Sequence, residues 1–170
     1  MSYQLKLIHD LALDYPYQIA NFPASIKYHH NQRGGWGQHI GEVTKIMHNI
    51  NNVECLGLNP DDCTLAAFLH DFAKLESYKE LPDGTFDKLE NRWKLMDPET
   101  WTVVKCAEKG VVLPENQVNA LLMAEGGWSA FARTTNRYCQ PASGSLATVL
   151  HCADMISSQI LSNLGHAKAA

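Results

Sequence analysis

The chain has 170 residues, of which 45% are hydrophobic and 19% are charged, and its net charge is −4 with the histidines neutral. This composition is typical of a globular protein and excludes a disordered chain, so we expect a single domain over residues 1–170. The acidic balance excludes the basic surface of a module that binds duplex nucleic acid, although it allows a small phosphate-bearing substrate.

No stretch approaches the run of about 20 apolar residues that spans a bilayer, so we expect no membrane association. The N-terminus lacks the basic start, apolar core and cleavage site of a secretory signal. The cysteines are odd in number and scattered, without a Cys-x-x-Cys pair, which favours a reducing cytoplasm over a disulfide framework. They are Cys55, Cys63, Cys106, Cys139 and Cys152.

The expected secondary structure is mostly helical. Ile40, Val43 and Met47 recur at helical spacing, and Asn59 followed by Pro60 is a typical helix start. The fold class is therefore all-α, with one short β-hairpin around a Pro-Asp-Gly turn. The expected elements are a helix over 2–14, an irregular segment over 16–37, helices over 38–51 and 60–75, the hairpin over 78–89, and helices over 98–110, 114–126 and 145–164.

Four polar side chains fall on or beside the apolar faces of three of these helices. His39 lies one turn before Val43, the pair His70 and Asp71 borders an alanine- and leucine-rich face, and Asp154 borders the face of the last helix. A buried carboxylate is costly unless it is paired or binds a metal. Singly, each residue also fits a structural role. Together, two imidazoles and two carboxylates suit a divalent cation such as Mn, Fe, Co, Ni or Zn, with Mg also compatible.

These four residues carry a resemblance to a known family. The segments "RGGWGQH", "AAFLHDFAK" and "VLHCADMIS" resemble the H…HD…D signature of the HD-domain metal-dependent phosphohydrolases, over residues 25–162. The resemblance implies a helical bundle that holds a metal between its helices on His39, His70, Asp71 and Asp154. Members of this family often form oligomers, so a homo-oligomer is one expectation.

The chain departs from relatives that bind two metals. Those relatives carry further histidines between the His-Asp doublet and the final aspartate, whereas residues 72–150 of this chain contain no histidine. In "LLMAEGGWS", Ala124 and Glu125 occupy the place of one such histidine. We therefore expect a single metal, with Glu125 as a weak second-site ligand or as a general acid or base.

Catalytic roles follow from the expected metal site. Asp71 or Glu125 would assist proton transfer, and Lys74 would contact a phosphate oxygen, because phosphate needs cationic or N–H donors. A solvated lysine at a helix end is the alternative for Lys74. Arg133 and Arg137, in a polar loop, are further candidates for phosphate contact.

Substrate contacts are expected from the loop before His39. His29, His30, Arg33 and Trp36 would frame a nucleobase or bind phosphate, and the neighbouring glycines would let the backbone approach a phosphate closely. The structural alternatives are a tryptophan that plugs the core and histidines that are exposed on a loop.

Three functional hypotheses remain open. The first is a metal-dependent phosphohydrolase of nucleotides, acting on deoxynucleoside mono- or triphosphates through metal-activated water. The second is a phosphodiesterase or 3′–5′ exonuclease, because "YHHNQRGGWGQH" resembles HD proteins that include some exoribonucleases. The third is a non-catalytic regulatory module that binds a nucleotide.

Overall fold

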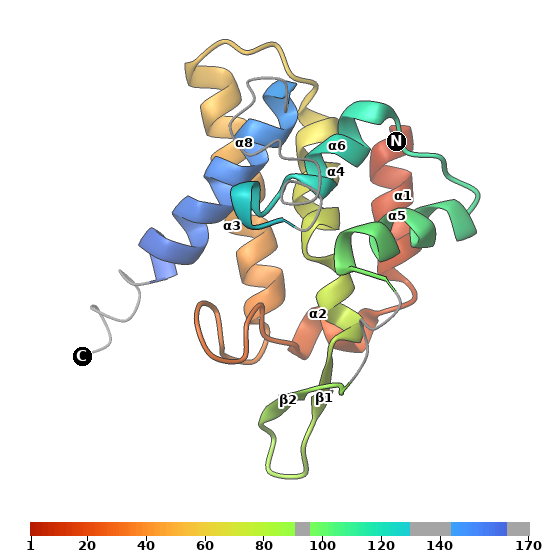
Figure 1. The fold of residues 1–170 in the computed structure, drawn as a ribbon, viewed down its shortest axis with the longest axis vertical. Coiled ribbons are helices and arrows are strands. Elements are labelled where there is room, and N and C mark those ends of the chain that lie inside the picture. Colours follow the sequence, from red (N-terminus) through yellow and green to blue (C-terminus); the bar gives the residue numbers. More distant parts are fainter. Residues whose placement is uncertain (91–95, 130–143, 163–170) are drawn as a thin grey trace.

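A computed structural model describes residues 1–90, 96–129 and 144–162 of the chain (Figure 1). The described elements, in chain order, are α1 (Tyr3–Ala12), α2 (Pro16–Asn21), α3 (Gly35–Val53), α4 (Pro60–His70), the 3₁₀ helix η1 (Phe72–Glu76), β1 (Tyr78–Glu80), β2 (Phe86–Lys88), α5 (Pro98–Glu108), α6 (Glu115–Leu122), the 3₁₀ helix η2 (Gly126–Trp128), α8 (Gly144–Met155) and the π-helical segment η4 (Ile156–Leu161).

Helix α4 is the centre of the fold and is buried on both sides. It packs against α1 and α5 on one side and against α3, α6 and α8 on the other. Leu65 and Leu69 join the first core cluster, whereas Ala66 and Ala67 join the second, where small side chains let the neighbouring helices come close. In Figure 1, α3 and α8 lie side by side to the left of α4. The expected all-α fold is confirmed.

The short hairpin is also confirmed. Strands β1 and β2 pair antiparallel, with Tyr78 opposite Lys88 and Glu80 opposite Phe86. The turn closes with Gly84 at φ 80°, in the left-handed region that favours glycine. In Figure 1 the hairpin projects away from the helices.

Three helix predictions need correction. The expected irregular segment contains α2, because Pro16 occupies the first helical position and its ring presets φ for a helix. The helix expected over 60–75 ends at His70, since Asp71 leaves helical geometry at φ −110° and ψ 10°, and the chain continues as 3₁₀ helix. The last helix widens into π-helix after Met155.

Within the described ranges, no helix combines the length and the apolar character needed to cross a membrane. The described cysteines are all free thiols, and Cys139 lies outside the described residues.

Candidate metal centre

Four side chains from three helices converge at the C-terminal end of α4. Nε2 of His39, from α3, lies 3.3 Å from Nε2 of His70. The same atom lies 3.2 Å from Oδ1 of Asp154, on α8, and 3.5 Å from Oδ2 of Asp71. Ligands bonded at about 2.1 Å to one ion lie about 3.0 Å apart in octahedral geometry and about 3.4 Å apart in tetrahedral geometry. The separations from His39 therefore fit one divalent cation, and the ligand atoms of His39, His70 and Asp154 all lie within 4.8 Å of one another.

The hydrogen bonds of His70 support this fit. Its Nδ1 donates to the carbonyl oxygen of Ala67 at 2.7 Å, so Nε2 of the neutral ring keeps its lone pair. The ring of His39 is fully buried, and burial holds the pKa of its imidazole below the usual range. Lone pairs and carboxylate oxygens thus face one another, and such a cluster is stabilised by a cation at its centre.

Both carboxylates of the centre are held in the ionised form. Burial alone would raise the pKa of Asp71, but Lys74, His70 and His39 together hold it well below its usual range. Nζ of Lys74 lies 2.7 Å from Oδ2 of Asp71. Burial likewise opposes ionisation of Asp154, but the neighbouring imidazoles of His39 and His70 lower its pKa. Ionised oxygens are the state in which carboxylates bind metals.

The centre opens into a cavity of about 810 Å³. His70, Asp71 and Asp154 line one part of it, and Lys74 and Glu125 are also in its wall. The other described residues that line it are Tyr28, His29, Glu99, Ala124, His151, Met155, Ser158 and Gln159. A volume of this size accommodates a ligand with a heterocycle and a phosphate.

Glu99 gives the cavity a carboxyl group that can carry a proton. Burial raises its pKa to about 7, and the nearby carboxyl groups of Asp97 and Glu125 add to the effect. A carboxyl group with a pKa near neutrality can act as a proton donor. Nothing in the sequence around Glu99, in the first turn of α5, distinguishes it from an ordinary helix-start acid.

Three residues expected to bind substrate do not line the cavity. Trp36 is 2% exposed, and its Nε1 donates to the backbone oxygen of Asp71 at 2.9 Å, so it belongs to the core. Arg33 is exposed and pairs with Glu80. His30 is buried beside Glu42 rather than facing the cavity. His29 and Lys74, in contrast, do line it.

Gly35, one of the glycines before His39, is required by the fold itself. A β-carbon on Gly35 would lie 2.0 Å from the carbonyl oxygen of His30, so only glycine permits the loop to close onto the start of α3. His30 itself adopts φ 46°, a conformation that is uncommon for a residue other than glycine. The close approach at Gly35 is therefore between its own backbone and the backbone of His30.

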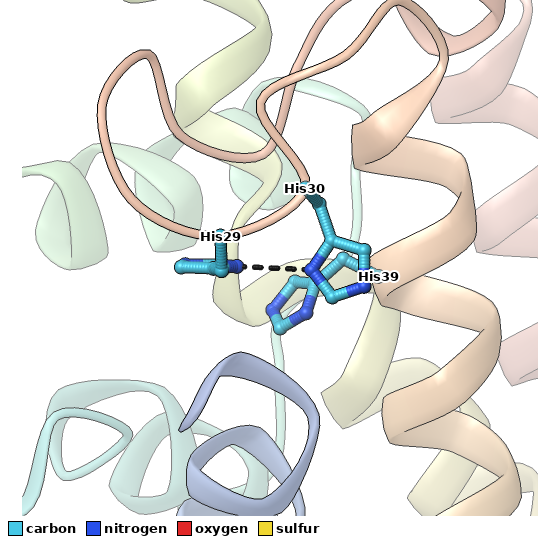
Figure 2. A group of neighbouring side chains, drawn as sticks. All are labelled: His29, His30 and His39. Carbon is cyan, nitrogen blue, oxygen red and sulfur yellow. Dashed lines mark hydrogen bonds between the residues drawn. The ribbon is translucent and has the colours of Figure 1, made fainter. Parts of the chain in front are cut away.

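A second group of possible metal ligands consists of His29, His30 and His39, whose nitrogen atoms lie within 4.8 Å of one another. Figure 2 shows the rings of His29 and His30 joined by a hydrogen bond between their Nδ1 atoms, 3.1 Å long, above the ring of His39. Nδ1 of His39 forms a hydrogen bond with Ser157, and its Nε2 faces His70. His39 therefore has no further nitrogen with which to bind a metal beside His29 and His30. We therefore place the candidate metal centre at His39, His70, Asp71 and Asp154.

The sequence pattern missed His151, which lines the cavity. It precedes Asp154 by three residues, and this spacing places both side chains on one face of α8. Its Nδ1 donates to the carbonyl oxygen of Ala124 at 2.8 Å, and Gly126 leaves room for its ring. Arg133 and Arg137 lie outside the described residues.

No family model and no solved structure matches the chain. The chain is similar to the dihydroneopterin 2′,3′-cyclic phosphate phosphodiesterase of Methanocaldococcus jannaschii, with 37% identity over 86 residues. The matched part makes up 48% of this chain and 34% of that protein, so the chain matches only about a third of its relative's length.

Proposed function

We propose that this chain is a metal-dependent phosphohydrolase that cleaves a phosphodiester, and that its substrate is a small cyclic phosphate bearing a heterocycle. The observation that carries the proposal is the convergence of His39, His70, Asp71 and Asp154 beside an open cavity. The similarity to a protein named as a cyclic phosphate phosphodiesterase supports the choice of a diester. The same site agrees with the HD-type resemblance of these four residues.

The charge of the cavity favours a diester over a nucleoside triphosphate. Among the described residues that line the cavity, only Lys74 is a lysine or arginine, and its ammonium group is already paired with Asp71. A bound divalent cation and Lys74 together roughly balance the carboxylates of Asp71, Asp154 and Glu125. Counted over the described residues, the site is nearly neutral, which suits the single charge of a phosphodiester and provides little compensation for the several charges of a triphosphate.

A divalent cation bound at this centre would lower the pKa of a coordinated water and polarise the phosphorus–oxygen bonds. In the hydrolysis, the water oxygen bonds to phosphorus, one ring P–O bond breaks, and the departing oxygen takes up a proton. Lys74 would stabilise the charge on a non-bridging phosphate oxygen. Asp71, whose low pKa makes it a weak base, would orient the attacking water, and Glu125 would take up its proton. Glu99 would protonate the departing oxygen.

The cavity also provides a place for the heterocycle. Tyr28 lines it and is 80% exposed, so its ring is available to a ligand without any rearrangement of the core. Aromatic rings stack on nucleobases and on related heterocycles. His29 follows Tyr28 in the cavity wall and would complete the contact.

A substrate panel tests the proposal. Purified protein loaded with Mn, Fe, Co, Ni, Zn or Mg is incubated with nucleoside 2′,3′-cyclic phosphates, dihydroneopterin 2′,3′-cyclic phosphate, deoxynucleoside mono- and triphosphates, and short oligonucleotides. We expect opening of the cyclic phosphates to monoesters without release of inorganic phosphate. Turnover of only mononucleotides or triphosphates would replace the diester proposal with the nucleotide hypothesis, and shortening of oligonucleotides would favour an exonuclease.

Two variants link any activity to this site. Asp154→Asn should abolish cyclic phosphate opening, whereas Glu54→Gln, an exposed change at the end of α3, should leave it intact. Binding of a nucleotide without any turnover, under every metal tested, would support the non-catalytic module instead.

A further inference from the structure

We propose that Glu42 is a positioning residue that fixes the tautomers of two histidines at the metal centre, so that His39 and His29 both keep a free Nε2 lone pair. Two hydrogen-bonded branches meet at this carboxylate, one through Ser157 and one through His30. The inference rests on the proposed metal centre, but it does not depend on the substrate.

Glu42 accepts hydrogen bonds and cannot donate them. Burial opposes its ionisation, but hydrogen bonds from Gln38, Ser157 and His30 hold the pKa of its carboxyl below the usual range. An ionised carboxylate is an acceptor only. Every group that contacts its oxygens must therefore supply the proton of that hydrogen bond.

The first branch fixes His39. The Ser157 hydroxyl donates its single proton to Oε2 of Glu42 at 2.8 Å. Its oxygen, 3.0 Å from Nδ1 of His39, must then accept a hydrogen bond from that nitrogen. A neutral His39 with its proton on Nδ1 has none on Nε2. The lone pair of Nε2 is thereby directed toward His70 and the two aspartates.

The second branch fixes His29. Nε2 of His30 lies 3.1 Å from Oε2 of Glu42 and must donate to it. Nδ1 of a neutral His30 is then an acceptor, and Nδ1 of His29, at 3.1 Å, donates to it (Figure 2). His29 is left with an unprotonated Nε2 in a ring that lines the cavity.

Unusual backbone geometry holds both branches in place. His30 is in the left-handed region at φ 46°, and its carbonyl oxygen is closed against Gly35. Ser157 is the second residue of the π-helical segment η4 and is fully buried. Short π-helical segments are frequent at functional sites. Both conformations bring a polar group to Glu42.

The consequence for the metal is direct. A proton on Nε2 of His39 would occupy the lone pair that a cation needs, and the opposite tautomer would thus compete with metal binding. The tautomer of His70 is fixed independently, by the carbonyl oxygen of Ala67. Glu42 fixes the tautomer of His39 in the same way, but it acts through the hydroxyl of Ser157 rather than by direct contact.

Metal affinity provides the first test. In competition with a chromophoric chelator, we expect Glu42→Gln and Ser157→Ala to bind Co²⁺ or Zn²⁺ about 10- to 100-fold more weakly than the parent protein, which is typical of outer-shell changes. Glu54→Gln makes the same chemical change on the exposed end of the same helix and should leave the affinity unchanged. Ser157→Thr, which retains the hydroxyl, should bind the metal with an affinity close to that of the parent protein. Parent-like affinity in both Glu42→Gln and Ser157→Ala would overturn the proposal.

Histidine NMR of the metal-free protein provides the second test and requires no activity. Long-range ¹H–¹⁵N correlation spectra at neutral pH should show the Nδ1–H tautomer for His29 and His39 and the Nε2–H tautomer for His30. An Nε2–H tautomer at His39, or a doubly protonated His30, would overturn the proposal. If the tautomers are as expected and no phosphodiester is cleaved, the proposed function fails while the role of Glu42 stands.

Discussion

The Asp154→Asn variant tests the metal centre through stability. Asp154 is on α8, whereas the other three candidate ligands belong to α3 and the end of α4, so a shared cation would join α8 to the centre of the fold. The carboxamide is a neutral and weaker ligand of similar size. It removes the repulsion between Asp154 and Asp71 but also the larger attraction of His39 and His70, which lowers the pKa of Asp154 overall, so we expect the metal-free variant to be slightly less stable than the metal-free parent protein.

The expected magnitude follows from linkage. At a metal concentration of about 100 times Kd, binding stabilises the parent protein by about 2.7 kcal/mol. For a chain of this length, that corresponds to a rise in Tm of about 5–11 °C. If the substitution weakens binding about 100-fold, the same concentration equals Kd, and only about 0.4 kcal/mol, or about 1–2 °C, remains.

Thermal unfolding followed by circular dichroism measures both quantities, with EDTA for the metal-free state and Mn²⁺ or Co²⁺ for the loaded state. Asp87→Asn makes the same chemical change on strand β2, where the side chain is exposed, and should keep the full metal-dependent shift. A full shift in Asp154→Asn would remove this residue from the ligand set. A large loss of stability in its metal-free form would show that the carboxylate has a structural role instead.

Three further predictions concern other parts of the molecule. Tyr28→Ala should raise KM for nucleoside cyclic phosphates about 5- to 30-fold, from loss of about 1–2 kcal/mol of stacking, but leave KM for glycerol 1,2-cyclic phosphate unchanged in steady-state assays. Gly35→Ala should destabilise the fold by about 1–3 kcal/mol in urea, because its β-carbon meets the carbonyl of His30, whereas Gly41→Ala, with open space around it, should not. Asp97 caps α5, and hydrogen bonds to its carboxylate outweigh burial and lower its pKa. Asp97→Ala should therefore cost about 1 kcal/mol in urea unfolding at pH 7, and this difference should shrink as the pH falls below about 4, where the parent carboxylate takes up its proton.

The overall fold was largely predictable because long helices have a strong periodic pattern. The apolar positions Ile40, Val43 and Met47 predicted α3, and Asn59 with Pro60 predicted the start of α4. The six residues of α2 are too few for any period to emerge. The end of α4 was missed because the sequence remains apolar after His70, and only backbone angles show that the helix has stopped.

The candidate ligands were predictable for a different reason. His39 and Asp154 are polar residues in helical faces that are otherwise apolar, and the doublet at the end of α4 has the same character. The residues that orient these candidate ligands show no comparable pattern in the sequence. Ser157 is 118 residues from His39 and 115 from Glu42 along the chain, and no local pattern relates positions so far apart. Trp36 had two interpretations, of which the structure supports burial in the core.

The break after α4 explains how two neighbouring residues can serve one centre. Consecutive residues of an α-helix point about 100° apart, so in a continuous helix His70 and Asp71 would face different directions. Because the helix ends at His70 and the chain tightens into η1, Oδ2 of Asp71 instead lies 3.8 Å from Nε2 of His70. Two contacts stabilise this arrangement: the indole of Trp36 donates to the backbone oxygen of Asp71, and Lys74, three residues later, pairs with its carboxylate. Trp36 therefore contributes to the site indirectly. Its indole holds the backbone of Asp71 in place, although it does not contact the carboxylate that would bind the metal.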